Sequence, residues 1–371
     1  MRKLLETGRI NTRVLAPVPW FPLKSELFGN YRHYAGIPVH EQRHGIEVFH
    51  PRYPMIPKIG MSLTPLLMAT FTRSIARTMY QNKQFQLLDA HYFYPDGVAA
   101  TLLGKWLNLP VVISARGTDI NLLPDYRLPR QMIIWAAQQA AAIITVCQSL
   151  KDRLIKLGIS DQKITVLANG VDSQLFKPGN RQELRKHHRL TRPTLLFVGN
   201  LISLKGVDII LQALAKLPEY ECIIIGEGPE KTTLEKLAHA LGVAERTRFI
   251  KTLSQTELVD YYTIADILLL PSSREGCANV LLEALSCGTP VIATAVGGSA
   301  DIIANSDAGL LMGQRDHDSL VATIRKLFSN LPETNMVREY SQRFSWPPII
   351  NQQMDIYQSV LNNQYLQSGS V

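Results

Sequence analysis

The sequence has few cysteines, no long apolar run and no short repeat. Its four cysteines are Cys147, Cys222, Cys277 and Cys287. They form no C-x-x-C pair, so the sequence predicts neither a zinc knuckle nor a dithiol redox site. We expect reduced, mostly buried thiols, as in a cytosolic protein. No stretch approaches 18 consecutive apolar residues, which excludes a membrane-spanning helix.

The N-terminus shows no secretory signal. It begins with the basic residues Arg2 and Lys3, but Glu6, Arg9 and Arg13 interrupt any apolar segment that would follow them. We therefore expect a cytoplasmic protein.

The composition is that of a globular protein with surplus positive charge. Of the 371 residues, 46% are hydrophobic and 19% are charged, which excludes a disordered, collagen-like or low-complexity chain. This length predicts two or three domains. Lys and Arg number 39 against 31 Asp and Glu, a formal net charge of +8. That charge suits a nucleic acid, an acidic lipid surface or a phosphorylated small molecule, and does not choose among them.

Short β-branched runs alternate with amphipathic stretches, which is typical of α/β units on parallel sheets. The expected strands are residues 14–17, 87–90, 111–115, 143–146 and 164–167, then 195–198, 222–225, 247–250, 267–270 and 290–293. The expected helices include residues 97–107, 128–142, 149–157, 207–217, 231–241 and 256–264, with Ser149 as an N-cap and Gly158 as a C-cap. A polar, basic run at 176–192 predicts a linker and a short solvated helix. The architecture is therefore two successive α/β halves with a cleft between them.

Residues 58–83 predict a basic amphipathic helix. Its apolar residues are Met61, Leu63, Leu66, Leu67, Met68 and Phe71, and its basic residues are Lys58, Arg73, Arg77 and Lys83. Such a helix either lies on an anionic membrane surface or packs against the sheet. The sequence leaves both open.

The most informative stretch is residues 266–298. The strand at 267–270 leads through a loop into a helix-forming run, with Asn279 as the N-cap and Gly288 after the last turn. The N-terminus of this helix points back to the carboxyl end of the strand, where ligands bind in open α/β sheets.

Backbone amides and carboxylates of this stretch can hold one ligand. Exposed N–H groups of Val280 and Leu281 suit a phosphate. Glu283 lies one turn inside the helix and can accept hydrogen bonds from vicinal hydroxyls such as those of a ribose. Glu275, in the preceding loop, can reach a second hydroxylated group. Alternatively, both glutamates are ordinary surface residues.

Several motifs in order resemble one known family. The segment REGCANVLLEALSCGTPVIAT, with Glu275 and Glu283 separated by seven residues, resembles the E-x7-E motif of the retaining nucleotide-sugar glycosyltransferases, family 4 (glycosyl transferases group 1). The other matching segments are FVGNL at 197–201 with Lys205 and Gly206, GEGP at 226–229, NGVD at 169–172 with Phe176 and Pro178, AHY at 90–92 with Asp96 and Gly97, and RGTD at 116–119. The resemblance covers nearly the whole chain.

This resemblance implies the α/β fold class named GT-B, in which two Rossmann-like doubly wound domains face a cleft. The N-terminal, acceptor-side domain would span residues 1–175, and the C-terminal, nucleotide-sugar-binding domain residues 176–344. Residues 345–371 would form a helix that crosses back onto the first domain.

The resemblance also assigns roles on the donor side. Glu283 would bind the ribose hydroxyls, and Glu275 would contact hydroxyls of the transferred sugar. Lys205, with the amides around Gly199 and 280–281, would neutralise the departing pyrophosphate, where most of the barrier lowering is expected.

Further residues complete the candidate sites. Gly226 and Asn279 belong to the donor-binding set. His91 would act on the acceptor hydroxyl or be an ordinary cleft histidine, and Asp119 is either a polar cleft residue or a helix cap. Cations and helix dipoles do the electrostatic work in this family, so no metal is implied, and no D-x-D pair follows a strand here.

This sequence departs from the family pattern at three places. Asn200 stands where the family commonly has Arg, so a phosphate contact is missing or is supplied by Arg274. Arg116 stands where the family often has a His that contacts the donor sugar; with Glu275, Lys205 and His91, it completes the candidate catalytic set. An Arg there can bind a phosphate or carboxylate through two hydrogen bonds. The family's glycine pair after the first strand is absent, and residues 17–22 lead instead to Gly29 and Asn30.

The resemblance therefore implies a retaining glycosyltransferase. It would move a hexose-type sugar from a nucleotide diphosphate donor to a hydroxyl of a glycan or lipid-linked acceptor, in cell-surface polysaccharide synthesis. No separate cofactor is expected, and the location is the cytoplasm, with a peripheral position at the inner face of the membrane left open.

Two alternatives remain. One is a non-catalytic nucleotide-sugar-binding regulatory protein of the same fold. The other is a nucleic-acid-binding protein that uses the +8 charge. We expect no nucleic-acid partner, because the basic run at 181–189 lacks interleaved aromatic residues for base stacking.

Overall fold

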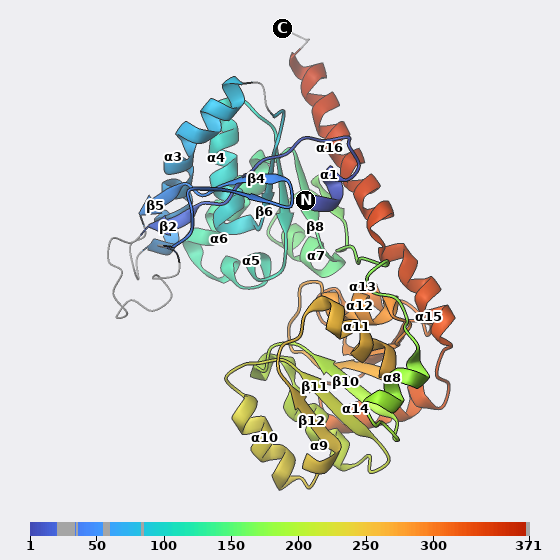
Figure 1. The fold of residues 1–371 in the computed structure, drawn as a ribbon. Coiled ribbons are helices and arrows are strands. Elements are labelled where there is room, and N and C mark those ends of the chain that lie inside the picture. The colour runs from blue at the N-terminus through green and yellow to red at the C-terminus, as the bar shows by residue number, and fades with distance from the viewer. Residues whose placement is uncertain (21–33, 35, 55–59, 83–84, 369–371) are drawn as a thin grey trace. The chain divides into compact units, whose positions relative to one another are not determined.

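The computed structural model of this chain describes residues 1–20, 34, 36–54, 60–82 and 85–368. Contacts divide the chain into two units (Figure 1). Unit 1 comprises Met1–Val146, Leu150–Leu167 and Ile350–Val371, and unit 2 comprises Cys147–Ser149 and Ala168–Ile349. The assignment of functional domains to residues 1–175 with 345–371, and to 176–344, stays a prediction.

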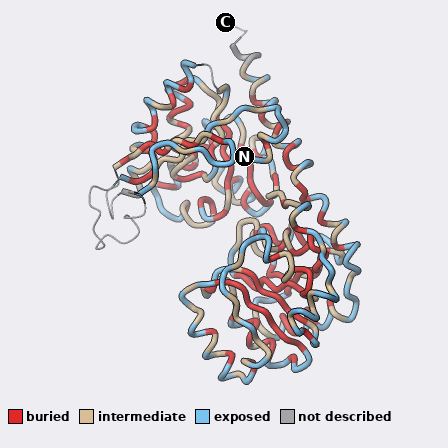
Figure 2. The backbone as a smooth tube through the Cα atoms, in the orientation of Figure 1, coloured by how far each residue is buried: buried red, intermediate tan, exposed pale blue. Residues whose placement is uncertain are grey.

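Unit 2 is built on a six-stranded sheet in which every neighbouring pair is parallel, in the order β12-β11-β10-β13-β14-β15. The strands are β10 (Thr194–Val198), β11 (Glu221–Ile225), β12 (Thr247–Ile250), β13 (Ile267–Leu270), β14 (Val291–Thr294) and β15 (Gly309–Met312). Every residue of β10, β11, β13 and β14 is buried, as Figure 2 shows by colour. Strands covered on both faces read as continuous apolar runs, so the five strands predicted here are confirmed to within one residue at each end.

Helices connect these strands. They are α8 (Arg181–His187), α9 (Val207–Ala215), α10 (Lys231–Ala240), α11 (Gln255–Ile264), α12 (Asn279–Ser286), α13 (Ser299–Ile302), α14 (His317–Phe328) and α15 (Thr334–Ser341). The predicted helices at 207–217, 231–241 and 256–264 are confirmed, with ends shifted by one or two residues.

The short, solvated basic helix after the linker is confirmed as α8, none of whose residues is buried, but two of its arginines also make contacts that were not predicted. Arg181 and Arg185 both bind the carboxylate of Asp266, at 2.6 and 3.3 Å. Arg181 also donates to the backbone oxygens of Thr263 and Ala265. These contacts fix α8 to the end of α11, so two residues of the basic run stabilise the packing of α8 against α11.

The described residues of unit 1 form three separate sheets. A parallel sheet has the order β6-β7-β8-β9, a second has the order β1-β4-β3, and β2 pairs with β5. The strands are β1 (Val14–Leu15), β2 (Val18–Trp20), β3 (His40–Arg43), β4 (Ile46–Phe49), β5 (Arg52–Pro54), β6 (Leu88–His91), β7 (Val111–Ala115), β8 (Ala142–Thr145) and β9 (Ile164–Val166). Of the predicted strand at 14–17, only Val14–Leu15 is a strand, β1; the next strand, β2, begins at Val18, outside the predicted range, and pairs with β5 instead of β4.

The helices associated with unit 1 are α1 (Arg2–Leu5), α3 (Gly60–Gln81), α4 (Val98–Leu107), α5 (Thr118–Asn121), α6 (Arg127–Gln139) and α7 (Gln148–Lys156). The long helix α16 (Trp346–Ser368) begins in unit 2 and continues in unit 1. The prediction that Ser149 is the N-cap of this helix is wrong, because α7 already includes Gln148. Gly158 lies after α7 with φ +88°, as expected of a residue that ends a helix.

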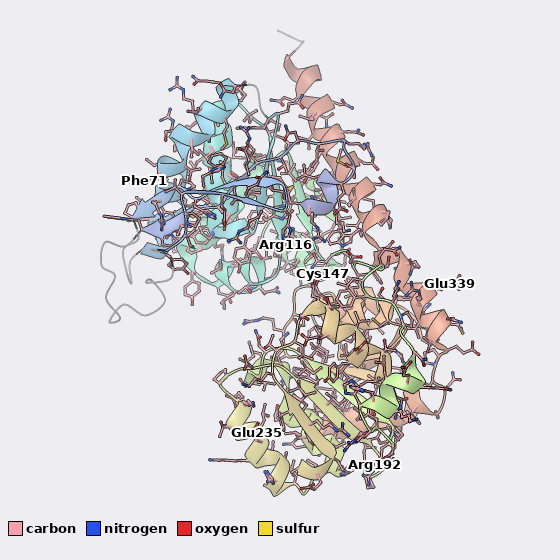
Figure 3. All side chains as sticks on the ribbon, viewed as in Figure 1. Phe71, Arg116, Cys147, Arg192, Glu235 and Glu339 are labelled. Carbon is pink, nitrogen blue, oxygen red and sulfur yellow. The ribbon has the colours of Figure 1, made fainter. Side chains whose placement is uncertain are left out.

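Helix α3 confirms the predicted amphipathic helix and shows that one face packs inside unit 1. Met68, Ala69 and Ala76 are buried in a cluster with residues of α4. Leu63, Leu66 and Phe71 stay exposed, and Figure 3 labels Phe71 at the outer side of the helix. Packing against the unit therefore accounts for part of the apolar face and leaves three large side chains in water. Lys58 and Lys83 lie outside the described residues.

The cysteine prediction holds. All four cysteines are free, and Cys147, Cys222 and Cys287 are buried while Cys277 is half-buried.

Candidate functional site

In unit 2, the loops after β10 and β11 lie against each other. Gly199 follows β10 and donates its N–H to the carbonyl of Ile225, at 3.0 Å. Gly226 follows β11 with φ +150°, and a Cβ on it would stand 1.9 Å from the carbonyl oxygen of Gly199. Only glycine permits this approach, so the two predicted site glycines form one backbone platform at the carboxyl edge of the sheet.

An ion pair joins two of the predicted catalytic residues. Lys205 Nζ lies 2.6 Å from Glu275 Oε1, and the two side chains are only 22% and 10% exposed. Lys205 ends a short 3₁₀ turn, Ser203–Lys205, and Gly206 follows it with φ +72°. A Cβ on Gly206 would stand 2.4 Å from the carbonyl oxygen of Pro271, so this turn is packed against the end of β13. The structure therefore brings Lys205 and Glu275 together from loops far apart in sequence.

Two glycines after β14 pack against the backbone of the loop that carries Glu275. Gly298 donates its N–H to the carbonyl of Gly276, at 2.7 Å. A Cβ on Gly297, which has φ +57°, would stand 2.3 Å from the carbonyl oxygen of Glu275. Sequence reasoning did not single out this glycine pair, although two adjacent glycines three residues after a buried strand signal a close backbone approach.

The N-terminus of α12 differs from the prediction. Ala278, not Asn279, is the N-cap, and no side chain caps the helix. Asn279 is the first helical residue and accepts a hydrogen bond from Asn169. Leu281 is fully buried, and its N–H already donates to the carbonyl of Ala278. In the first turn of α12, the N–H groups of Asn279 and Val280 have no acceptor among the described residues, so the amide pair open to a phosphate lies one residue earlier than expected.

Glu283 lies half-buried on α12 and has a partner that sequence reasoning missed. Tyr262, fully buried at the end of α11, donates its hydroxyl to Glu283 Oε2 at 2.7 Å. Burial raises the pKa of Glu283, and the hydrogen bond from Tyr262 partly offsets this rise. The tyrosine thus orients one carboxylate oxygen.

Cations surround the loop after β10. Arg274 is exposed, and no described residue bonds its guanidinium, while Asn200 is also exposed. Arg315, which was not predicted, follows β15 and donates from Nε to the carbonyl of Pro271 at 2.8 Å and from a terminal nitrogen to Ser203 at 3.2 Å. Arg315 could have been predicted as a site residue from its position after a parallel strand, but β15 itself was not predicted. Among the described residues, no group of three or more His, Cys, Asp or Glu could hold a metal ion.

In unit 1, His91 and Arg116 are in direct contact at the carboxyl ends of β6 and β7. The Arg116 guanidinium bonds His91 Nδ1, and His91 Nε2 lies 3.0 Å from Asp89 Oδ2. Tyr357 of α16 donates its hydroxyl to the same oxygen at 2.6 Å. Burial opposes ionisation of Asp89, but the hydrogen bond and the electrostatic interaction with His91 hold the pKa of Asp89 below its ordinary value. Figure 3 labels Arg116 in this unit.

Asp119 organises the loop around this cluster. Its carboxylate is fully buried and accepts hydrogen bonds from the backbone N–H groups of Phe93, Arg116 and Gly117, at 2.7–3.2 Å. Burial raises the pKa of Asp119, and these three N–H donors act against the rise. The predicted cap role is not seen, because Asp119 lies inside α5 and no side chain caps that helix; its carboxylate instead binds the backbone of the loops before α5 and after β6. Gly29 and Asn30, of the altered loop, lie outside the described residues.

Burial raises the pKa of Asp96 to about 6, so this group should make stability depend on pH. The folded protein holds the proton more tightly than the unfolded chain, and stability is therefore lost as the pH rises through about 6. A rise from 3.8 to about 6 corresponds to roughly 3 kcal/mol. We expect Asp96→Asn to leave the unfolding free energy unchanged at pH 4 and to raise it by 1–3 kcal/mol, as an order of magnitude, at pH 7.5. Urea unfolding of both proteins at the two pH values measures this, and a variant gain that is equal at both would contradict it.

Comparisons with known protein families cover both units. Residues 180–344 match the family described as Glycosyl transferases group 1. Residues 26–175 match the family described as Glycosyltransferase Family 4.

Among similar proteins, D-inositol 3-phosphate glycosyltransferase 2 of Catenulispora acidiphila is 30% identical over 325 residues, 79% of this chain and 75% of that protein. N-acetyl-alpha-D-glucosaminyl L-malate synthase of Bacillus anthracis is 26% identical over 296 residues, 76% of this chain and 77% of that protein.

Among solved structures, HepE of Anabaena in complex with UDP has a TM-score of 0.74 at 18% identity, covering 94% of this chain and all of that chain. Sucrose-phosphate synthase from Thermosynechococcus elongatus has a TM-score of 0.73 at 20% identity, covering 88% of this chain and 87% of that chain. At these identities, the likeness establishes the fold. The predicted fold class is confirmed, and this chain is a glycosyltransferase of the GT-B fold that belongs to the group 1, family 4 glycosyl transferases.

Proposed function

We propose that this protein transfers a hexose-type sugar from a nucleoside diphosphate donor and retains the anomeric configuration. The observation that carries the proposal is the Lys205–Glu275 pair at the carboxyl edge of the unit 2 sheet, beside the Gly199–Gly226 platform. A cation next to exposed backbone is suited to a diphosphate, and a carboxylate held by that cation is suited to sugar hydroxyls.

Each donor-side residue then has a distinct task. Glu283, oriented by Tyr262, would accept hydrogen bonds from the two ribose hydroxyls. Lys205, Arg274 and the N–H groups at the start of α12 would stabilise the charge that develops on the departing diphosphate. This charge stabilisation is sufficient in principle without a metal ion, and we propose a metal-independent reaction.

On the acceptor side, we propose a hydroxyl of a glycan or a lipid-linked saccharide. His91 is held by Asp89 and Arg116, so its ring orientation is set before an acceptor binds. Arg116 would pair with a phosphate or carboxylate of the acceptor. In support, two similar proteins are named for D-inositol 3-phosphate and L-malate, each of which carries an anionic group and at least one hydroxyl.

We also propose that α3 brings the enzyme to an anionic membrane surface, where cell-surface polysaccharide is made. Leu63, Leu66 and Phe71 are exposed on a helix that also carries Arg73 and Arg77. Apolar side chains interleaved with basic ones are typical of interfacial helices. Co-sedimentation with vesicles of anionic and of zwitterionic lipid tests this. In the structure, no helix of the described residues is long and apolar enough to cross a bilayer.

A thermal-shift screen with UDP-, GDP- and ADP-sugars tests the donor proposal. A ligand that binds only the folded state raises the melting temperature, and we expect one nucleotide to do so clearly. Glu283→Gln should then weaken that donor by about 10- to 100-fold, since a hydrogen bond to a charged group is worth about 1.5–3 kcal/mol. The matched control is Glu339→Gln, on an exposed residue of α15, which should bind as the parent does. No response to any sugar nucleotide would end the proposal.

A further inference from the structure

A cavity of about 680 Å³ in unit 1 lies between the strands β1 and β6. Val14 and Leu15 of β1 line it, and so do all four residues of β6. In the described chain, β1 pairs with β4 alone and β6 with β7 alone. Both strands therefore turn an unpaired edge to the same cavity.

The edge of β6 presents backbone hydrogen-bonding groups to this cavity. Leu88 and Tyr92 donate their N–H groups to carbonyls of the β7 segment. Backbone groups alternate in direction along a strand, so those of Asp89 and His91 point away from β7. Both residues line the cavity.

The edge of β1 is arranged in the same way. Ala16 donates its N–H to the carbonyl of Phe49, at the end of β4. By the same alternation, the backbone groups of Leu15 point away from β4, and Leu15 lines the cavity. Unpaired edges inside a unit are costly, because buried N–H and C=O groups are almost always bonded.

Helices supply apolar side chains around the cavity. Met68 and Met79 of α3 and Leu103 of α4 line it, as do Met354 and Leu361 of α16. Figure 1 draws α16 on the opposite side of the unit 1 strands from α3 and α4. A strand covered by helices on both faces is apolar throughout, like the strands of unit 2.

Two buried polar atoms at the cavity lack a partner. Asp89 Oδ1 and Thr72 Oγ1 have no hydrogen bond within the described part of the chain, although both atoms are buried and both residues line the cavity. An occupant with N–H or hydroxyl donors would satisfy them. Protein interiors rarely keep voids much larger than a water molecule, whose share of liquid volume is about 30 Å³.

The two units differ at this point of their sheets. In unit 2, the strand order is continuous, and the central strand β10 is bonded to β11 on one side and to β13 on the other. In unit 1, the position between β1 and β6 holds the cavity instead of a strand.

We propose that this cavity is the binding site of one more β-strand, an extended polypeptide segment with apolar side chains on both faces. It pairs with β1 on one edge and with β6 on the other, and so joins the two sheets into one. The volume alone would also suit a small molecule, whose sites span about 300–1,000 Å³, but a small molecule does not satisfy two rows of backbone groups. One end of the bound strand lies beside His91, next to the acceptor-side cluster.

The test supplies the strand to the full chain. A valine- and isoleucine-rich segment of about seven residues is fused ahead of Met1 through a flexible linker of about fifteen residues. The matched control carries two prolines in the segment, which remove backbone donors. Amide hydrogen exchange at Asp89 and His91 is then compared in the unfused chain, the fusion and the proline control. We expect exchange at both amides to slow by at least about a hundredfold in the fusion only.

The opposite results are equally clear. If the proline control protects these amides as well as the fusion does, or if neither protects them, no strand binds there. Slow exchange at Asp89 and His91 in the unfused chain would show that the edge is already paired. Equal protection by dodecanol, which has no amide groups, would make the cavity a small-molecule site and overturn the proposal.

Discussion

Replacing Lys205 by methionine should lower the rate of sugar transfer by about a thousandfold. Removing one preorganised hydrogen-bond donor that stabilises charge in the transition state lowers kcat by about 10²- to 10³-fold. Here the same change also leaves Glu275, a 10% exposed side chain, without the cation that lies 2.6 Å away. Steady-state kinetics should show the loss in kcat rather than in the KM for the donor, because the charge develops as the diphosphate departs.

The control for this variant is Lys216→Met, which breaks an exposed pair with Asp318 whose side chains are 48% and 71% exposed. Exposed pairs contribute little, so its rate should match that of the parent. The double variant Lys205→Met/Glu275→Gln separates the two effects of the Lys205 change. Its rate is compared with that of Glu275→Gln alone: if adding Lys205→Met to Glu275→Gln lowers the rate further, the lysine acts on the substrate and not only through Glu275. A fall in rate of less than about tenfold in Lys205→Met would contradict the proposed role.

Gly226→Ala is expected to destabilise the protein by about 3 kcal/mol and to abolish donor binding. The methyl group would stand 1.9 Å from the carbonyl oxygen of Gly199, at a φ of +150° that L-residues rarely adopt. Since the obstacle is backbone, the loops after β10 and β11 must separate. Urea unfolding and a thermal-shift titration with the donor measure the two effects.

Gly242→Ala separates strain from crowding. Gly242 also has a positive φ, +68°, but nothing lies within 4 Å of the position of its Cβ. Gly242→Ala should lower the free energy of unfolding by only about 1 kcal/mol, because an L-residue is strained in this backbone conformation, and it should leave donor binding intact. Equal losses in the two variants would show that the Gly199–Gly226 contact has no special part in the site.

The sequence was sufficient to predict five of the six described strands of unit 2, all but β15, because both faces of that sheet are covered. Four of its strands are fully buried, so each reads as a short apolar run bounded by turn residues. The strands β3, β4 and β5 were missed. β3 is largely exposed and carries polar residues, and β5 has three residues ending in proline. Such segments become strands through their partners, which a local pattern does not contain.

In the candidate site, too, local features could be predicted and long-range contacts could not. The chemistry of Lys205, Glu275 and Glu283 could be predicted because their motifs are local. Their partners could not, since Tyr262 is 21 residues from Glu283, and Lys205 is 70 residues from Glu275. The N-cap was misplaced by one residue, because Asn279 bonds Asn169 instead of its own helix.

The membership of the last helix in both units has a consequence for synthesis of the chain. Unit 1 includes residues from 350 onward, and Tyr357 supplies the hydroxyl bonded to Asp89. A ribosome synthesises these residues last, after the whole of unit 2. Unit 1 therefore receives its last helix only at the end of synthesis, and products truncated before residue 350 should lack the hydroxyl that bonds Asp89 and carry an incompletely folded unit 1.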